Sequence, residues 1–290
     1  METISIGALL PSKTLGYDDS RMQVSPSIHP RRRWVVLCLH DVLLQTTASG
    51  GGPERFAVPL ESFERLLDGI VAAGAAGCSL FEARRRVEPS VAITFDDATR
   101  SHLEVAAPAL VRRGMTATIY VPTDRVGRAG YLTWDELRVL KGLGFSLQSH
   151  TASHPFLSEL DEEAVRHELT ASKAALDTEL DQDTEEIAFP NGDPPRREFR
   201  HLIKETGYSL AIGSRWGVIR GQPTADHIVP RCTARGPLSS QWISRVIAAD
   251  RSMEIRSLAR ESVLRTTRAL IGPTRYAALR RLVLDSYDGR

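Results

Sequence analysis

Short apolar runs alternate with amphipathic stretches between residues 34 and 212 of the chain. The apolar runs are continuous, as in strands that are buried on both faces, whereas the amphipathic stretches place apolar residues at helical spacing. The expected strands are 34–39, 91–95, 116–121, 145–148, 187–189 and 208–212. The expected helices are 60–71, 104–113, 133–142, 162–180 and 199–206. This alternation predicts a mostly parallel sheet with crossover helices, and about six or seven such units favour an α/β barrel over an open sheet.

The distribution of residue types divides the chain into three parts. Residues 1–30 are polar and rich in Pro and Ser, which predicts a flexible N-terminal arm. Residues 31–238 contain the alternating pattern and form the predicted barrel domain. Residues 239–290 form a predicted basic helical extension, in which positions 251–290 contain nine Arg against two Glu and two Asp. An apolar helical face in this extension could rest on an anionic membrane surface or pack on a helix of the barrel.

The overall composition is that of an ordinary globular protein. Of the 290 residues 42% are hydrophobic, and the net charge of +1 gives no indication of a nucleic-acid partner. The three cysteines, Cys38, Cys78 and Cys232, are widely spaced, which favours reduced thiols over a disulfide framework. The N-terminus lacks a basic segment before an apolar run, and no apolar stretch is long enough to span a bilayer. These features predict a cytoplasmic protein, with the inner face of the membrane as a second location.

Two groups of potential metal ligands follow strands in this pattern. Asp96 and Asp97 close the run 91–95, and His150 and His154 follow the run 145–148. Taken alone, the carboxylate pair could be a turn or a helix cap, and the histidines could cap a strand end. Both groups lie at the carboxyl ends of expected strands, where α/β barrels collect their functional residues. Together they offer three ligands for a metal ion and one free carboxylate that can accept a proton.

The residues around these groups resemble the motifs of a known family. Thr94-Phe95-Asp96-Asp97 is similar to the first motif of the polysaccharide deacetylases, the NodB-homology group of carbohydrate esterase family 4. The segment 149–154 is similar to the second motif, His-(Ser/Thr)-x-x-His, and the segment 189–192 is similar to the third. The motifs occur in family order, and the resemblance covers approximately residues 34–235. It implies a distorted (β/α)7-type barrel of the NodB-homology kind.

The resemblance also implies a division of roles between the two groups. Asp97, His150 and His154 would bind a divalent metal ion, usually Zn²⁺, and Asp96 would be the general base that deprotonates the attacking water. Ala98 stands where the family has a Gly after the carboxylate pair, which is a mild change.

The third motif implies a border of the substrate site. Pro190 and Asn191 would line it, and the backbone N–H of Asn191 would help to stabilise the oxyanion. This stabilisation is needed because an acetamide is a poor electrophile and its carbonyl must be polarised.

The amine leaving group needs a proton, which in most of the family comes from a His in a late motif. The segment 37–42, at the end of the first expected strand, resembles that motif moved to the front of the chain. The deacetylases of poly-N-acetylglucosamine biosynthesis have such a permuted arrangement. We therefore expect His40 to be the general acid, although a His that caps a buried strand would look the same in sequence. Its neighbour Asp41 could orient another side chain or be a plain turn residue.

The third motif departs from the family at two positions. Ala188 stands where the family has the Arg that orients the base, and Asn191 stands where it has an aromatic residue. Arg215 or Arg231 could replace this Arg from another strand. For Arg231, a structural ion pair is as consistent with the sequence as a role at the substrate or oxyanion site. Trp216 could stack on a sugar face or belong to the core.

The resemblance and the residues together predict a metal-dependent N-deacetylase that hydrolyses the acetamide of an N-acetylated amino sugar. The sugar could be part of a glycan, a lipid-linked precursor or a small conjugate. Two other functions are compatible with the same residues. One is hydrolysis of a non-sugar amide or formamide. The other is carbohydrate binding without catalysis, which the absence of an Arg at position 188 suggests.

Overall fold

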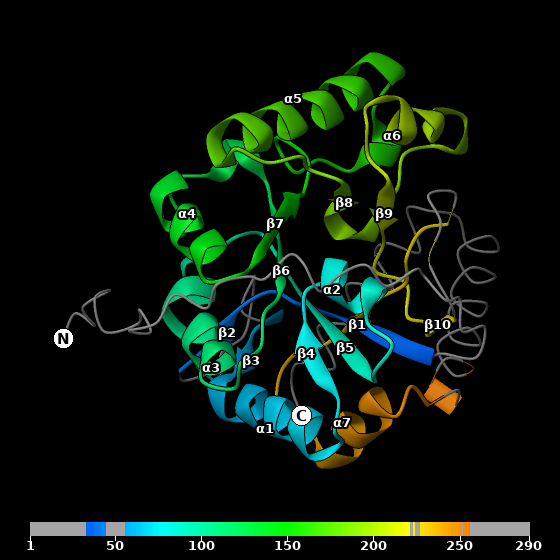
Figure 1. Ribbon diagram of the computed structural model, residues 1–290. Helices are drawn as coiled ribbons and strands as arrows, with labels where there is room; N and C mark the ends of the chain where they lie inside the picture. The colour runs from blue at the N-terminus through cyan, green and yellow to red at the C-terminus, as the bar shows by residue number, and fades with distance from the viewer. Residues whose placement is uncertain are drawn as a thin grey trace, which may run out of the picture.

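The computed structural model describes residues 33–44, 56–220, 223, 227–250, 252–253 and 255. The described chain forms a curled sheet with most of its helices packed on its outer side (Figure 1). The predicted arm at 1–30, and the apolar face predicted within 276–283 of the basic extension, lie outside the described residues. The division into three parts therefore stays a prediction.

Six parallel strands run side by side in sequence order and form the body of the sheet. They are β1 (Arg33–Leu39), β5 (Ser90–Asp96), β6 (Thr118–Val121), β7 (Ser146–Ser149), β8 (Glu186–Ala188) and β9 (Leu210–Ile212). Every residue of β5 is buried, as predicted for a strand that is covered on both faces. The parallel arrangement is confirmed, and the predicted strand positions are confirmed to within two residues at their ends.

Short strands extend the sheet. β4 (Ala76–Cys78) pairs with β5, while β10 (Ile219–Arg220) and β11 (Cys232–Thr233) both pair with β1. A small separate sheet joins β2 (Val42–Leu43) to β3 (Val58–Pro59).

The sheet curls because one late segment reaches both of its ends. Val229 forms a parallel bridge with Ile212 of β9, and three residues later Cys232 pairs with Leu37 of β1. Residues 229–233 therefore span the space between the last and the first parallel strand. This geometry is a curled half-barrel, and it confirms the predicted distorted α/β barrel.

Helices connect the strands in the predicted alternation. They are α1 (Leu60–Ala72), α2 (Leu80–Arg85), α3 (Ala107–Val111), α4 (Trp134–Gly142), α5 (Glu162–Leu180), α6 (His201–Glu205) and α7 (Ser240–Ile247). Short 3-10 turns cover Thr123–Arg125, Leu157–Glu159, Pro190–Gly192 and Arg197–Phe199. A capping box starts α4, because Thr133 and Glu136 exchange side-chain and backbone hydrogen bonds.

The expected helix at 104–113 differs from the structure. A π-helical turn, His102–Ala106, precedes α3. The irregularity coincides with Pro108, which has no N–H to continue the α-helical hydrogen-bond ladder. The segment 76–85, which forms β4 and α2, was not predicted, since each element is too short for a clear periodic pattern.

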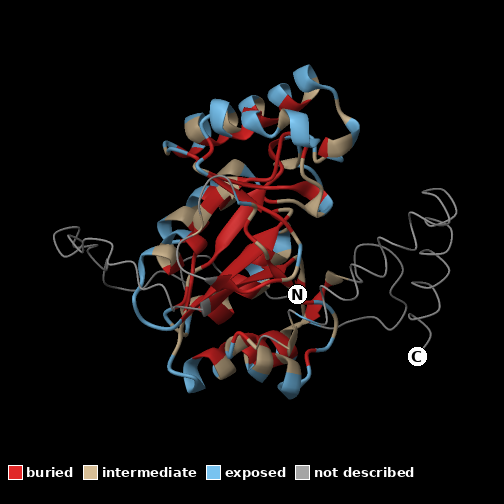
Figure 2. Cartoon of the chain, turned by 90° about the vertical axis from the view of Figure 1, so that its right-hand side faces the viewer, coloured by how far each residue is buried: buried red, intermediate tan, exposed pale blue. Residues whose placement is uncertain are grey.

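The strands of the sheet are buried, while the helices around them expose their outer sides (Figure 2). The two faces of the sheet carry different clusters of buried side chains. On the convex face, Val91, Ile93 and Phe95 of β5 belong to the main core, together with residues of α1 and α3. On the concave face, Ala92 of β5 packs with Tyr120 and with α2. Since side chains alternate along a strand, Asp96 points to the same concave side as Ala92.

The last described helix packs into the main core. Ile243 and Val246 of α7 are buried there, and α7 lies beside α1 (Figure 1). Among the described residues, every helix is too short or too polar to cross a membrane.

Candidate active site

The predicted site residues lie at the carboxyl ends of neighbouring strands. β5 ends at Asp96, β7 ends just before His150, and β1 ends just before His40. The strand registers place these ends at a similar height, because Leu39 pairs with Phe95 and Val121 pairs with Ser149. The parallel sheet therefore gathers side chains that are far apart in sequence at one edge.

The three predicted metal ligands converge on one point. Donor atoms of Asp97, His150 and His154 all lie within 4.8 Å of one another. His154 Nε2 is 3.1 Å from Asp97 Oδ1, and His150 Nε2 is 4.0 Å from the same oxygen. Within the described chain, this buried oxygen has no hydrogen bond of good geometry. One carboxylate and two imidazoles, with a buried oxygen left to be satisfied, fit a divalent cation such as Zn²⁺.

A hydrogen bond fixes the orientation of the first histidine. His150 Nδ1–H donates to the carbonyl oxygen of Ala188 at 2.8 Å, which leaves the lone pair of Nε2 facing Asp97. Burial lowers the pKa of His150 to about 4, so the imidazole is neutral near pH 7. Burial raises the pKa of Asp97, but His154 and His150 outweigh it and hold that pKa at about 2. Both groups are therefore in the protonation state that a metal ion requires.

Asp96 is held by a buried guanidinium. Arg231 Nη1 donates to Asp96 Oδ1 at 2.6 Å, and Nη2 donates to Oδ2 at 2.7 Å. The side chain of Arg231 is 0% exposed and that of Asp96 is 4% exposed, so solvent does not screen this pair. Burial works against ionisation of Asp96, but Arg231 outweighs it and holds the pKa of Asp96 well below its usual range.

The other N–H groups of Arg231 are also bonded. Nε donates to the carbonyl oxygen of Gly213 at 2.7 Å, Nη1 also donates to Thr94 Oγ1, and Nη2 also donates to Ser214 Oγ. Of the two arginines that the sequence offered as substitutes for an Arg at 188, Arg231 is thus the one bound to Asp96. Its burial and its bonds favour a positioning role over direct contact with substrate.

His40 lies beside Asp96 at the end of β1. Donor atoms of Cys38, His40 and Asp96 fall within 4.8 Å of one another. The His40 ring stacks on Phe56 at 4.9 Å between centroids, and its Nδ1 has no hydrogen-bond partner in the described part of the chain. The carbonyl oxygen of His40 accepts a hydrogen bond from His102 Nε2, which comes from the π-helical turn. The imidazole is therefore held in place, and its buried Nδ1 is unpaired among the described residues.

Comparison with known proteins agrees with this geometry. The family model described as polysaccharide deacetylase matches residues 83–211, which contain both carboxylates and both histidines. This part of the chain belongs to the polysaccharide deacetylase family. The chain is also 30% identical over 142 residues to YxkH of Bacillus subtilis (strain 168), a protein provisionally named as a polysaccharide deacetylase. That match covers 49% of this chain and 50% of YxkH, so the chain spans about half the length of this curated relative.

Solved deacetylase structures share the fold. The Streptococcus pyogenes deacetylase PplD, in complex with acetate, has a TM-score of 0.67 and 23% identity, over 75% of this chain and 99% of PplD. BC0361, a polysaccharide deacetylase from Bacillus cereus, has a TM-score of 0.66 and 23% identity, over 74% of this chain and 69% of BC0361. IcaB from Ammonifex degensii has a TM-score of 0.61 and 22% identity, over 74% of this chain and 95% of IcaB. These similarities show that the chain and the three solved structures share one fold.

The loop after the carboxylate pair has a special backbone conformation. Asp97 and Ala98 have φ of 78° and 51°, in the left-handed region that favours glycine. Ala98, which replaces the family's Gly, is thus strained, and side-chain bonds stabilise the loop. Thr99 Oγ1 and Ser101 Oγ both donate to Asp41 Oδ1, at 2.5 and 2.8 Å. Asp41 therefore orients this loop and is more than a plain turn residue.

The predicted oxyanion loop lies next to Ser214, which binds Arg231. Asn191 is exposed and has a φ of 57°, within the turn Pro190–Gly192. Gly192 also has a positive φ of 67°, and a Cβ there would lie 2.6 Å from Ser214 Cβ, so only glycine permits this approach. Ser214 Oγ in turn accepts a bond from Arg231. Trp216 is partly buried against the main core, and its predicted contact with a sugar stays a prediction.

Two contacts in the site were not anticipated from the sequence. Arg125 Nη1 lies 3.6 Å from Asp97 Oδ1, and the carbonyl of His40 binds His102. Neither residue belongs to a family motif, and both come from irregular turns, so spacing alone gave no signal for them.

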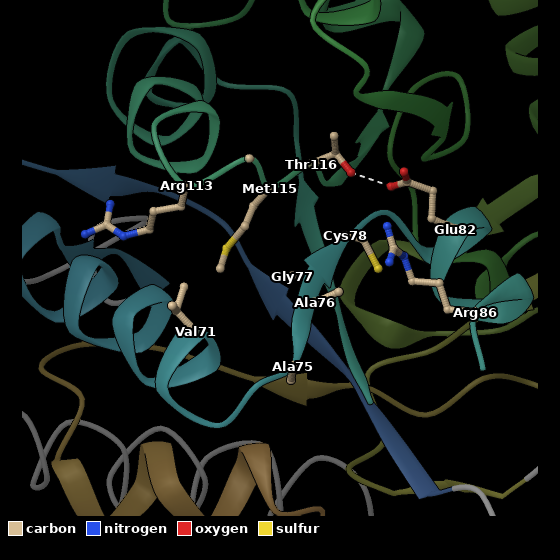
Figure 3. Close-up of a pocket in the computed structure, with 11 residues that line it drawn as sticks. Val71, Ala75, Ala76, Gly77, Cys78, Glu82, Arg86, Arg113, Met115 and Thr116 are labelled. Carbon is tan, nitrogen blue, oxygen red and sulfur yellow. Dashed lines mark hydrogen bonds between the residues drawn. The ribbon is translucent and has the colours of Figure 1, made fainter. Parts of the chain in front are cut away.

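A surface hollow elsewhere on the described chain is separate from this site. Figure 3 shows it at the amino ends of β4 and β6, where Thr116 Oγ1 donates to Glu82. Its lining includes Cys78, Arg86 and Met115 and none of the predicted site residues. The candidate active site therefore lies at the opposite ends of the strands.

Proposed function

We propose that this protein is a metal-dependent deacetylase that hydrolyses the acetamide of an N-acetylated amino sugar. One observation carries this proposal: two adjacent carboxylates at the end of β5 have different partners. Asp97 faces two histidine nitrogens, while Asp96, the adjacent residue, faces Arg231. One carboxylate is thus placed to bind a cation and the other to accept a proton.

A divalent cation held by Asp97, His150 and His154, which we take to be Zn²⁺, would polarise the acetyl carbonyl and lower the pKa of a water molecule. Asp96 then accepts the proton from the attacking water. The guanidinium of Arg231 keeps the Asp96 carboxylate ionised and fixes both of its oxygens, at the cost of making it a weaker base.

Asn191 and His40 would serve the two remaining steps, which are stabilisation of the oxyanion and protonation of the amine. The backbone N–H of Asn191 stabilises negative charge on the carbonyl oxygen as the water adds to the carbon atom. His40 donates a proton to the amine nitrogen while the carbon–nitrogen bond breaks, which releases acetate and the free amine. Its position beside Asp96 and its unpartnered Nδ1 support this role.

The polysaccharide deacetylase match supports an acetylated sugar as substrate. A glycan, a lipid-linked sugar and a small conjugate all carry the required acetamide. A cytoplasmic location, or one at the inner face of the membrane, belongs to the same proposal and rests on the composition alone.

Acetate release from N-acetylglucosamine oligomers tests the proposal. We expect release by the purified protein, loss of release in the presence of a chelator, and recovery when Zn²⁺ is returned. A His150→Ala variant should bind no stoichiometric metal and release no acetate. Activity that survives both chelation and this substitution would exclude the metal mechanism.

The matched control is His167→Ala. His167 is an exposed residue of α5 and lies outside the site. It should leave metal content and acetate release unchanged. If the wild-type protein binds metal but cleaves only formamides or non-sugar amides in a substrate panel, the chemistry holds and the sugar assignment is wrong.

A further inference from the structure

The segment between the two histidines is held from outside the motif by a buried carboxylate. Glu168 of α5 is 7% exposed. Its Oε2 accepts hydrogen bonds from the backbone N–H groups of Ala152 and Ser153, both at 2.9 Å. Its Oε1 accepts a third hydrogen bond from Ser153 Oγ at 2.5 Å. One side chain, from the helix that covers this part of the barrel, therefore binds two successive residues of a three-residue segment.

The backbone of that segment is under strain. Thr151 and His154 have φ of 66° and 67°, in the left-handed region that a β-branched or bulky residue rarely adopts. Such conformations persist only where surrounding contacts impose them. Within the segment, the backbone N–H of His154 donates to Thr151 Oγ1 at 3.1 Å. The turn after β6 also holds the loop, because the N–H groups of Thr123 and Asp124 donate to the carbonyl oxygens of Thr151 and Ala152 at 3.2 and 3.0 Å. Glu168 binds the opposite, N–H side of the loop backbone.

The burial of the Glu168 carboxylate is the second observation. Removing a charged group from water is unfavourable unless its hydrogen bonds compensate for the lost solvation. Hydrogen bonds from N–H and O–H groups to an ionised acceptor are stronger than those to a neutral one. Glu168 thus provides strong bonds at the point where a strained loop must present His154 to Asp97 at 3.1 Å.

We infer that Glu168 is a positioning residue that sets the geometry of the metal ligands through the loop 151–154. It touches neither substrate nor metal ion, and acts by holding the backbone between His150 and His154. This inference rests on the proposed function, because it presumes that these histidines bind a metal ion. The simpler alternative is that Glu168 only anchors α5 to the barrel and contributes to stability alone.

Metal affinity separates the two roles. We would compare wild-type protein with Glu168→Gln and Glu168→Leu, and measure Zn²⁺ affinity by competition with a chromophoric chelator. Loss of outer contacts that orient metal ligands weakens metal binding about 10- to 100-fold. We expect a loss of that size for Glu168→Leu and a smaller loss for Glu168→Gln, which keeps one acceptor oxygen and the shape of the side chain. Ser153→Ala, which removes only the third bond, should have the smallest effect.

The visible absorption of the Co²⁺-loaded protein gives a second readout. A changed position or intensity of the Co²⁺ bands in Glu168→Leu would report altered ligand geometry, which a purely stabilising contact does not produce. Glu163→Gln is the matched control, since Glu163 is an exposed residue on the same helix. It should have wild-type affinity and spectrum.

The outcomes separate this inference from the proposed function. If Glu168→Gln and Glu168→Leu unfold at lower denaturant concentration but keep wild-type Zn²⁺ affinity and Co²⁺ spectrum, Glu168 is only an anchor and the inference is overturned. If Glu168→Leu does not fold, Glu168→Gln and Ser153→Ala decide by the same measurements. If the wild-type protein itself binds no metal ion, the proposed function fails first.

Discussion

Arg231 donates a hydrogen bond to each carboxylate oxygen of Asp96, although the two residues are 135 positions apart in sequence. The segment that carries Arg231 is also the one that spans the space between β9 and β1. The interaction that orients the proposed base is therefore part of the closure of the sheet.

Replacing Arg231 should affect activity and stability separately. Lys keeps the positive charge but cannot form the two parallel hydrogen bonds, so Arg231→Lys should fold and lose about 10- to 100-fold in kcat because Asp96 is no longer fixed. Arg231→Leu leaves a buried carboxylate without a partner and should lower the free energy of unfolding by about 3–5 kcal/mol. Acetate release and urea denaturation measure the two effects.

Arg235→Lys is the control for this pair, because Arg235 is an exposed residue near the same segment. It should behave as wild type in both assays. Full activity in Arg231→Lys would show that orientation by the guanidinium is not required.

Loss of the general acid should depend on the leaving group. An amine needs a proton to leave, whereas a nitrophenolate does not, so His40→Gln should lower amide hydrolysis by about 100-fold or more and aryl acetate hydrolysis much less. Steady-state rates on an N-acetylglucosamine oligomer and on 4-nitrophenyl acetate test this. Equal losses on both substrates would assign His40 to another role, such as packing against Phe56.

Metal binding should appear as added stability. A ligand that binds only the folded protein at 100 times its dissociation constant adds about 2.7 kcal/mol. For a domain of this size we expect Zn²⁺ to raise Tm by about 5–10 °C. Asp97→Ala and His154→Ala should lose this shift, and His201→Ala, on the exposed side of α6, should keep it. An unchanged shift in both ligand variants would place the metal ion elsewhere.

A buried acid on the concave face should make stability depend on pH. Burial raises the pKa of Glu186 to about 7, although Tyr120 OH donates a hydrogen bond to it at 2.9 Å and opposes the rise. Its ordinary value is 4.5, so the folded protein holds a proton that the unfolded chain has lost between these two values. The stabilisation is complete below pH 4.5 and is lost as the pH rises through about 7.

The size of this effect is measurable by comparison with a neutral variant. The two pKa values correspond to a change on the order of 3 kcal/mol. Between pH 5 and pH 8, the wild-type protein should lose more free energy of unfolding than Glu186→Gln by up to that amount. Urea denaturation at several pH values gives both curves, and parallel curves would show that Glu186 is ionised in the folded protein.

Much of the fold and part of the site follow from the sequence. The continuous apolar run before Asp96 is a fully buried strand, and the periodic stretch 162–180 is a helix with the predicted bounds. These patterns are local, since period and composition over a few residues determine them. The convergence of Asp97 with the histidines follows as well, because parallel strands bring their carboxyl ends to one edge.

The sequence limits the candidate partners of Asp96 to two arginines but does not decide between them. Arg215 and Arg231 are both near the end of the barrel in sequence, and only the pairing of Val229 with Ile212 turns Arg231 toward Asp96. Glu168 gave no signal either, since a Glu within an amphipathic helix is expected to face solvent. The contact of Arg231 with Asp96 and that of Glu168 with the loop 151–154 depend on how distant segments pack. A local sequence pattern does not contain this information.

The position of Arg231 late in the chain has a consequence for how this protein acquires its activity in the cell. A chain growing from the ribosome contains all three ligands once residue 154 has been added, and it contains Glu168 and Ala188, which orient them, once residue 188 has been added. Arg231 is added later still. Under the proposed mechanism, a nascent chain could bind its ion long before it could catalyse hydrolysis. The order of translation would then set the order of events. The metal ion would bind first, and hydrolysis would begin only after residues 229–233 have joined β9 to β1.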